Sequence, residues 1–123
     1  MRKKSKNPRK AILDTADRSL QDWLRRTYPK KKCESCLIRT FYCGHHFIEK
    51  SKSNNLRFNL LNIIFICKNC HSRHHCFGDA TIHARIQSNK GEEWWQELQK
   101  EYKKKTSAFT IKELKVFIEI YEQ

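Results

Sequence analysis

One stretch of the chain, residues 33–75, decides the fold and reads CESCLIRTFYCGHHFIEKSKSNNLRFNLLNIIFICKNCHSRHH. It contains two Cys-x-x-Cys pairs, Cys33/Cys36 and Cys67/Cys70, with thirty residues between them. Each pair places two sulfurs on one side of a tight turn, and tetrahedral zinc needs two such pairs. We therefore predict a structural Zn²⁺ site formed by these four cysteines.

The alternative of a disulfide-rich secreted protein is disfavoured by the N-terminus. Its basic residues are followed by only three apolar ones, Ala11, Ile12 and Leu13, which are too few for the core of a signal peptide. No apolar run approaches the length of a membrane span. We expect a cytoplasmic protein without a membrane partner, and paired cysteines in that compartment favour metal over disulfide.

Histidines follow the second cysteine pair at helical spacing. The apolar run Ile63–Ile66 predicts the second strand of a hairpin, and a helix from near Lys68 would carry His71 and His75 on one face. Two imidazoles at this spacing can bind one ion, and a third ligand from the facing strand would leave coordination positions open. We choose His45 as that third ligand. His74, three residues after His71, competes with His75.

The flanking segments predict further helices. Residues 1–10 form a basic flexible arm, and an amphipathic helix over residues 11–28 is ended by Pro29. Asn7 and Pro8 are a plausible cap and first residue for this helix, which would then run from about residue 8 to Thr27. Residues 79–123 predict C-terminal helices, with a break over residues 88–91 and a capping box at Thr110. At this length we expect one domain over residues 11–123.

The net charge of +13 is distributed unevenly. Residues 1–32 carry twelve basic and three acidic side chains, residues 33–78 carry six and two, and residues 79–123 carry eight of each. A positive field on the arm and the cysteine-histidine stretch attracts phosphates, so we predict a nucleic-acid partner. The candidate nucleic-acid-binding residues are Lys50, Lys52, Arg57, Arg73, Arg25 and Arg26.

The histidine doublet His45-His46, Asn62 and the helix histidines resemble the HNH endonuclease family over residues 33–75. This resemblance implies an α+β fold: a small zinc-braced ββα-metal core over residues 33–78 with flanking N- and C-terminal helices. More narrowly, the segments GHHFIEKS (44–51) and LRFNLLN (56–62), followed by the second cysteine pair, look like those of the phage NinG/Rap recombination nucleases.

The resemblance implies a metal-dependent endonuclease that hydrolyses DNA. His46 would be the general base and Asn62 would orient it, while His45, His71 and His75 would hold one catalytic divalent cation, Mg²⁺, Mn²⁺, Ni²⁺ or Zn²⁺. Consecutive strand residues point to opposite faces, so the roles of His45 and His46 could be exchanged. A phage or prophage recombination enzyme would act on duplex or branched DNA in a bacterial host cell.

Two other functions remain open at this point. The chain could be a non-catalytic zinc-finger DNA-binding protein whose histidines only surround a structural site, or a nuclease directed at RNA. A junction-cutting enzyme needs two active sites to make paired nicks, which would favour a homodimer.

Overall fold

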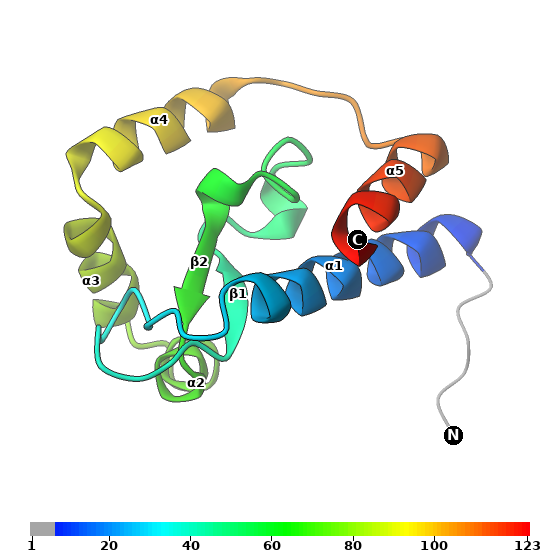
Figure 1. The fold of residues 1–123 in the computed structure, drawn as a ribbon. Coiled ribbons are helices and arrows are strands. Elements are labelled where there is room, and N and C mark those ends of the chain that lie inside the picture. The colour runs from blue at the N-terminus through cyan, green and yellow to red at the C-terminus, as the bar shows by residue number, and fades with distance from the viewer. Residues whose placement is uncertain (1–6) are drawn as a thin grey trace. The chain divides into compact units, whose positions relative to one another are not determined.

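The computed structural model describes residues 7–123 and shows an α+β protein. Within those residues five α-helices accompany one sheet of two strands (Figure 1). The α+β class predicted from the sequence is therefore confirmed. The basic arm predicted over residues 1–10 lies mostly outside the described part of the chain, and its last three residues belong to the first turn of a helix instead.

Contacts divide the chain into two compact units. One unit combines the described residues up to Thr27 with Ala108–Gln123, and the other is Tyr28–Ser107. This grouping differs from the one domain expected over residues 11–123, because the first and last helices pack on each other across the length of the sequence.

In the first unit, α1 (Pro8–Thr27) has the bounds that the Asn7-Pro8 signal predicts, and it begins three residues before the range 11–28. The Asn7 side chain accepts a hydrogen bond from the backbone N–H of Arg9 at 3.0 Å, so Asn7 caps the helix and Pro8 occupies its first position. The helix ends two residues before Pro29.

The partner of α1 in this unit is α5 (Ile111–Glu122). The predicted capping box is present, with the Thr110 hydroxyl and the Glu113 carboxylate each accepting from the other residue's backbone N–H. The ring of Tyr121 lies 5.4 Å from that of Trp23 between centroids, so the two helices bury their apolar faces against each other.

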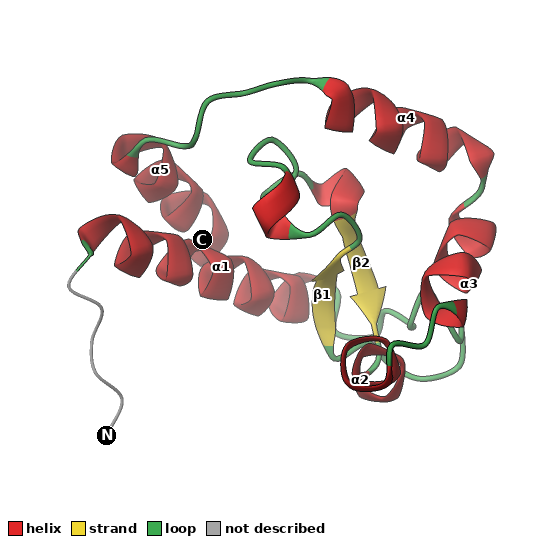
Figure 2. Ribbon diagram, turned by 180° about the vertical axis from the view of Figure 1, so that it is seen from behind, coloured by secondary structure: helices red, strands yellow, loops and turns green. Residues whose placement is uncertain are grey.

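The second unit is built on a hairpin of β1 (Cys43–His46) and β2 (Ile63–Ile66). The two strands lie side by side (Figure 2). They are antiparallel, and His45 pairs with Ile64. The β-branched isoleucines of β2 favour a strand, and both Ile64 and Ile66 are fully buried. The connecting loop contains two short 3-10 helices, Lys50–Lys52 and Leu60–Asn62.

Three helices follow the hairpin: α2 (Lys68–Phe77), α3 (Thr81–Lys90) and α4 (Glu92–Lys103). Gly78 ends α2 with a φ of 60°, in the left-handed region that favours glycine. The break predicted over residues 88–91 is confined to Gly91, which has a φ of 92°. None of the helices in the described part of the chain is both long and apolar enough to cross a lipid bilayer.

The core of the second unit joins the cysteine pairs to the hairpin and to α3 and α4. The indole N–H of Trp94 donates to the backbone carbonyl of Leu61 at 2.8 Å and so ties α4 to the end of the hairpin loop. The buried residues of this core are Cys33, Cys43, Leu56, Ile64, Ile66, Cys67, Cys70, Ile82, Ile86, Trp94 and Leu98.

Candidate metal centres

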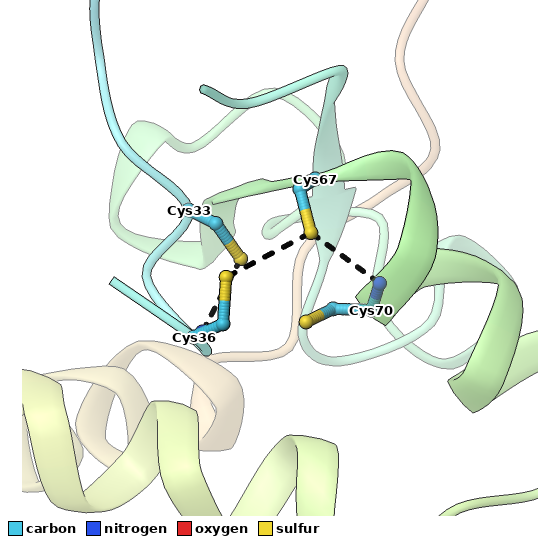
Figure 3. Close-up of side chains that lie close together, drawn as sticks. All are labelled: Cys33, Cys36, Cys67 and Cys70. Carbon is cyan, nitrogen blue, oxygen red and sulfur yellow. Dashed lines mark hydrogen bonds between the residues drawn. The ribbon is translucent and has the colours of Figure 1, made fainter. Parts of the chain in front are cut away.

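The four predicted zinc ligands come together. Cys33 and Cys36 lie on one turn, and Cys67 and Cys70 lie at the start of α2, with all four sulfurs within 4.8 Å of one another (Figure 3). The sulfurs of Cys36 and Cys67 are 3.9 Å apart. Tetrahedral zinc with Zn–S bonds of about 2.3 Å separates its sulfurs by roughly 3.8 Å, so the arrangement is compatible with a zinc site.

Local backbone geometry aims these sulfurs at one another. The N–H groups of Ser35 and Cys36 point at the Cys33 sulfur, at 3.4 and 3.5 Å, and the N–H of Cys70 points at the Cys67 sulfur at 3.4 Å. N–H donors stabilise a thiolate more than a neutral thiol. The turn is also tied to the hairpin, because the N–H of Glu34 donates to the Phe65 carbonyl at 2.7 Å.

Burial makes the thiolates unequal in proton affinity. It raises the pKa of Cys67 to about 12 and also raises the pKa of Cys70. Burial opposes ionisation of Cys36 too, but hydrogen bonds from the backbone of Arg39 and Ile38 and from the thiols of Cys33 and Cys67 together outweigh it and lower the pKa to about 6. A metal-bound thiol is deprotonated outright, so a soft divalent cation is the partner that satisfies this donor set.

A second cluster is formed by histidines. His45 of β1 lies with His71 and His75 of α2, and ligand nitrogens of the three are within 4.8 Å of one another. The rings of His71 and His75 are 4.4 Å apart between centroids, as their spacing of four residues on a helix predicts. The structure therefore brings together the three residues that we predicted to share an ion.

His83 also belongs to this cluster, and the sequence reasoning missed it. It lies on α3, and its Nε2 is 2.9 Å from the Nε2 of His45. Its ring stacks on that of His74 at 4.1 Å, and ligand nitrogens of His45, His74 and His83 lie within 4.8 Å of one another. Residue spacing holds no signal for this contact, because it depends on how the turn at Gly78 redirects the chain.

Burial favours the neutral form of four histidines in this cluster, His45, His71, His74 and His83. It lowers the pKa of His45 to about 2, helped by the charges that neighbouring histidines would carry, and it lowers that of His83 to about 4. The pKa values of His71 and His74 are lowered as well, again mainly by burial. Neutral imidazole is the form that binds metals, so these side chains are ready for an ion at neutral pH.

These pKa values predict a pH dependence of stability. Imidazoles of the unfolded chain have a pKa near 6.5, so below that pH they bind protons, while His45 and His83 of the folded chain stay neutral because their pKa values are lower. The free energy of unfolding should therefore fall as the pH drops below about 6.5 towards the folded pKa values, with full stability above that pH. Denaturant unfolding between pH 8 and 5.5, with one equivalent of zinc to fill the thiolates, measures it. His83→Gln should flatten the curve, and an unchanged curve would contradict this origin.

His46 contacts the hairpin loop. Its Nε2 lies 2.7 Å from the backbone carbonyl of Arg57. A carbonyl can only accept, so Nε2 carries the proton and Nδ1 is the nitrogen that can accept one in the neutral ring. Of the two doublet histidines, His45 is thus the one that lies with the helix histidines.

Asn62 is fully buried and holds both sides of the loop that His46 contacts. Its carbonyl oxygen accepts from the N–H of Ile48 at 2.8 Å, and its amide donates to the carbonyls of Ile48 and Leu56 at 2.9 and 3.3 Å. Ile48 follows His46 by two residues, and Leu56 precedes Arg57. Asn62 therefore ties the backbone just after His46 to the backbone just before Arg57, whose carbonyl the His46 ring contacts.

The six predicted nucleic-acid-binding residues are spread over both units. Lys50 and Lys52 are exposed in the hairpin loop, while Arg57 is half-buried there and supplies the carbonyl that His46 contacts. Arg73 is paired with Asp79 at 2.5 Å. Arg25 and Arg26 belong to the unit of α1 and α5, where Arg26 donates to the Tyr121 carbonyl at 2.6 Å.

Lys52 lines a basic pocket that the sequence reasoning did not find. The pocket has a volume of about 650 Å³ and lies between the loop after Lys52 and the C-terminal end of α4. The Asn55 amide donates to the backbone carbonyl of Glu101 at 2.9 Å, which holds the two walls together. Residues 79–123 carry equal numbers of basic and acidic side chains, so their net charge gave no sign of the basic cluster at the C-terminal end of α4. Its lining residues are Lys52, Ser53, Asn54, Gln99, Tyr102, Lys103, Lys104, Lys105 and Thr106.

Two of the six cysteines lie outside the zinc cluster and differ from each other. Cys43 is the first residue of β1 and is buried, whereas Cys76 is exposed near the end of α2. No protein-family model, no curated protein and no solved structure matches this chain. Its function therefore has to be inferred from the two clusters and the basic pocket.

Proposed function

We propose that the chain is a metal-dependent endonuclease of the HNH type, which hydrolyses DNA phosphodiester bonds. The observation that carries the proposal is the gathering of His45 from a strand with His71 and His75 from the helix that follows the hairpin. His46, the neighbour of His45, is held on a different set of contacts. A metal site and a separate base are two parts that together can hydrolyse a phosphodiester.

The donor set of this site fits a divalent ion. Three imidazoles supply three ligands, which leaves coordination positions for water and a phosphate oxygen. When bound there, a divalent cation would stabilise the charge that develops on the phosphate and on the leaving 3′ oxygen. The four thiolates would hold a separate, structural zinc, because a site with four protein ligands has no open position.

His46 acts as the general base in this proposal. Its Nδ1 accepts a proton from a water molecule, whose oxygen attacks the phosphorus in line while the bond to the 3′ oxygen breaks. The 3′ oxygen takes up a proton from solvent, which gives a 3′ hydroxyl and a 5′ phosphate. Asn62 is a positioning residue, since it orders the loop whose Arg57 carbonyl holds the His46 ring.

The net charge of +13 and the basic pocket support nucleic acid as the substrate. Lys52 and Lys103 face the pocket from opposite walls, and a phosphate backbone is the polyanion such a surface would attract. We extend the proposal to branched DNA, as in phage or prophage recombination in a bacterial host. A homodimer would then supply the two active sites that paired nicks require.

Removing two charges from the pocket should weaken DNA binding. Lys103→Gln with Lys105→Gln deletes two lining cations, so the slope of log affinity against log salt should shrink by roughly 0.9 for each lost phosphate contact. Lys112→Gln with Lys115→Gln is the matched control, because both lysines are exposed on α5 and the change in net charge is equal. Fluorescence anisotropy across a salt series measures both, and equal slopes would remove the pocket from the DNA contact.

The proposed function is tested by cleavage assays on linear, flapped and four-way DNA and on matched RNA, each with Mg²⁺, Mn²⁺, Ni²⁺ or Zn²⁺. The expected result is ion-dependent cleavage of DNA that leaves 5′ phosphates. Tight binding without cleavage in every ion would instead support a zinc-finger binding protein. Preferred cleavage of RNA would show that RNA and not DNA is the substrate, while the proposed hydrolysis of phosphodiester bonds would stand.

A further inference from the structure

We infer that His45, His74 and His83 form a second metal-binding site, which shares His45 with the proposed catalytic site. Ligand nitrogens of these three residues lie within 4.8 Å of one another, as do those of His45, His71 and His75. Only the consequence for cleavage rests on the proposed function. The existence of the second site depends on metal binding alone.

The nitrogen positions are close to those that an ion needs. His45 and His83 meet at 2.9 Å between their Nε2 atoms. Tetrahedral zinc with Zn–N bonds of about 2.0–2.1 Å separates its ligand nitrogens by roughly 3.3 Å, so this pair has to open by only a few tenths of an ångström. A small movement of these two side chains is enough for this pair, and the third ligand, His74, has a nitrogen within 4.8 Å of both.

One nitrogen of His74 lacks a partner that an ion would supply. The Nδ1 atom of His74 is buried and has no hydrogen bond among the described residues. Buried polar atoms are nearly always satisfied, and such an exception points to a group that the protein binds. The unsatisfied nitrogen of His74 thus supports a metal ion at the second site. This observation is independent of the hydrogen bond between His45 and His83.

The rings of the second site are held in place from several elements. His83 stacks on His74 at 4.1 Å with 10° between the ring planes, and on Phe47 at 4.2 Å with 16°. His45 comes from β1, His74 from α2 and His83 from α3. An ion bound here would connect α3 to the hairpin, and packed rings on three elements form a pre-organised ligand set.

The two sites exclude each other because His45 belongs to both. To serve two ions at once, one imidazole would have to give up its remaining N–H proton and bridge them. The histidine cluster should therefore hold one ion at a time. His74 and His83 are half-buried whereas His75 is exposed, so the second position is the more enclosed and leaves less room for a phosphate.

Both histidine sites offer three imidazoles, which suit Zn²⁺, Cu²⁺ or Ni²⁺ and are poor ligands for Mg²⁺. An ion of this class bound to His45, His74 and His83 withdraws His45 from the proposed catalytic ion. Excess zinc or copper would consequently inhibit cleavage through this position.

Metal stoichiometry tests the second site directly. Protein with zinc already on the four thiolates is titrated with Cu²⁺ and with Zn²⁺, followed by native mass spectrometry and calorimetry. Wild type should bind one further ion, and both His75→Gln and His83→Gln should still bind one, because each keeps one complete triad. His45→Gln and the combined His75→Gln/His83→Gln variant should lose affinity by more than about 100-fold.

The outcomes separate the second site from the proposed function. If His75→Gln binds no ion beyond the thiolate zinc, the second site does not exist, and two further ions on wild type would overturn the mutual exclusion. Unchanged circular dichroism of each variant guards against unfolding. In a cleavage assay, the ratio of rates with and without excess zinc should move towards one in His83→Gln. If the protein cleaves nothing, the stoichiometry still decides whether the site exists.

Discussion

His46→Ala is expected to slow DNA cleavage by roughly 10²- to 10⁴-fold, which is the usual contribution of a positioned general base. The Arg57 carbonyl holds the proton on Nε2, so Nδ1 is the atom whose loss removes the base. His46 is not among the histidines that gather around His45, so the metal content should stay unchanged. Single-turnover rates on a DNA substrate measure the effect.

Two controls make this prediction specific. DNA affinity and the thermal unfolding of His46→Ala should match wild type, because the side chain is only partly buried. Added imidazole should restore part of the cleavage rate by taking the vacated place. Wild-type cleavage by the variant would remove His46 from the role of base, and a loss of DNA binding would assign it to the substrate contact instead.

Loss of the thiolate zinc should unfold the unit Tyr28–Ser107. Structural zinc contributes roughly 10 to 16 kcal/mol in small zinc-dependent domains, while an ordinary domain has a net stability of only about 5 to 15 kcal/mol. The variant Cys67→Ala should therefore lack a cooperative unfolding transition for these residues, and a strong chelator should have the same effect on wild type. Circular dichroism and amide hydrogen exchange measure this.

Cys76→Ala is the matched control for Cys67→Ala. Cys76 is exposed and lies outside the four-cysteine cluster, so its replacement should leave stability within about 0.5 kcal/mol of wild type. Adding zinc back should refold chelated wild type but not Cys67→Ala. A chelated protein that keeps its unfolding transition would show that the hydrophobic core alone holds this unit together.

Local sequence signals predicted the parts of the fold that depend on neighbouring residues. The cysteine pairs could be predicted because each turn fixes two sulfurs within four residues. The capping box at Thr110 and the shared face of His71 and His75 likewise depend on short-range geometry alone. Alternation along a strand also predicted that His45 and His46 face different ways.

Features made by distant parts of the chain could not be predicted in this way. His83 reaches His45 only because Gly78 turns the chain between α2 and α3. The pocket at Lys103 depends on the hydrogen bond from Asn55 to Glu101. Its two walls lie far apart in the sequence, so the composition of a single segment does not reveal it. The pairing of α1 with α5 is a contact between the two ends of the chain, which periodicity does not encode.

The most direct test of the central claim is nicking of supercoiled plasmid by protein that carries its thiolate zinc, with and without an added divalent ion, for wild type and His45→Gln. Wild type is predicted to nick only when the ion is added, and His45→Gln is predicted to stay at background in every ion while it keeps its circular dichroism. Nicking that does not depend on the ion, or equal nicking by both proteins, would contradict a cation held by the histidine cluster as the source of cleavage.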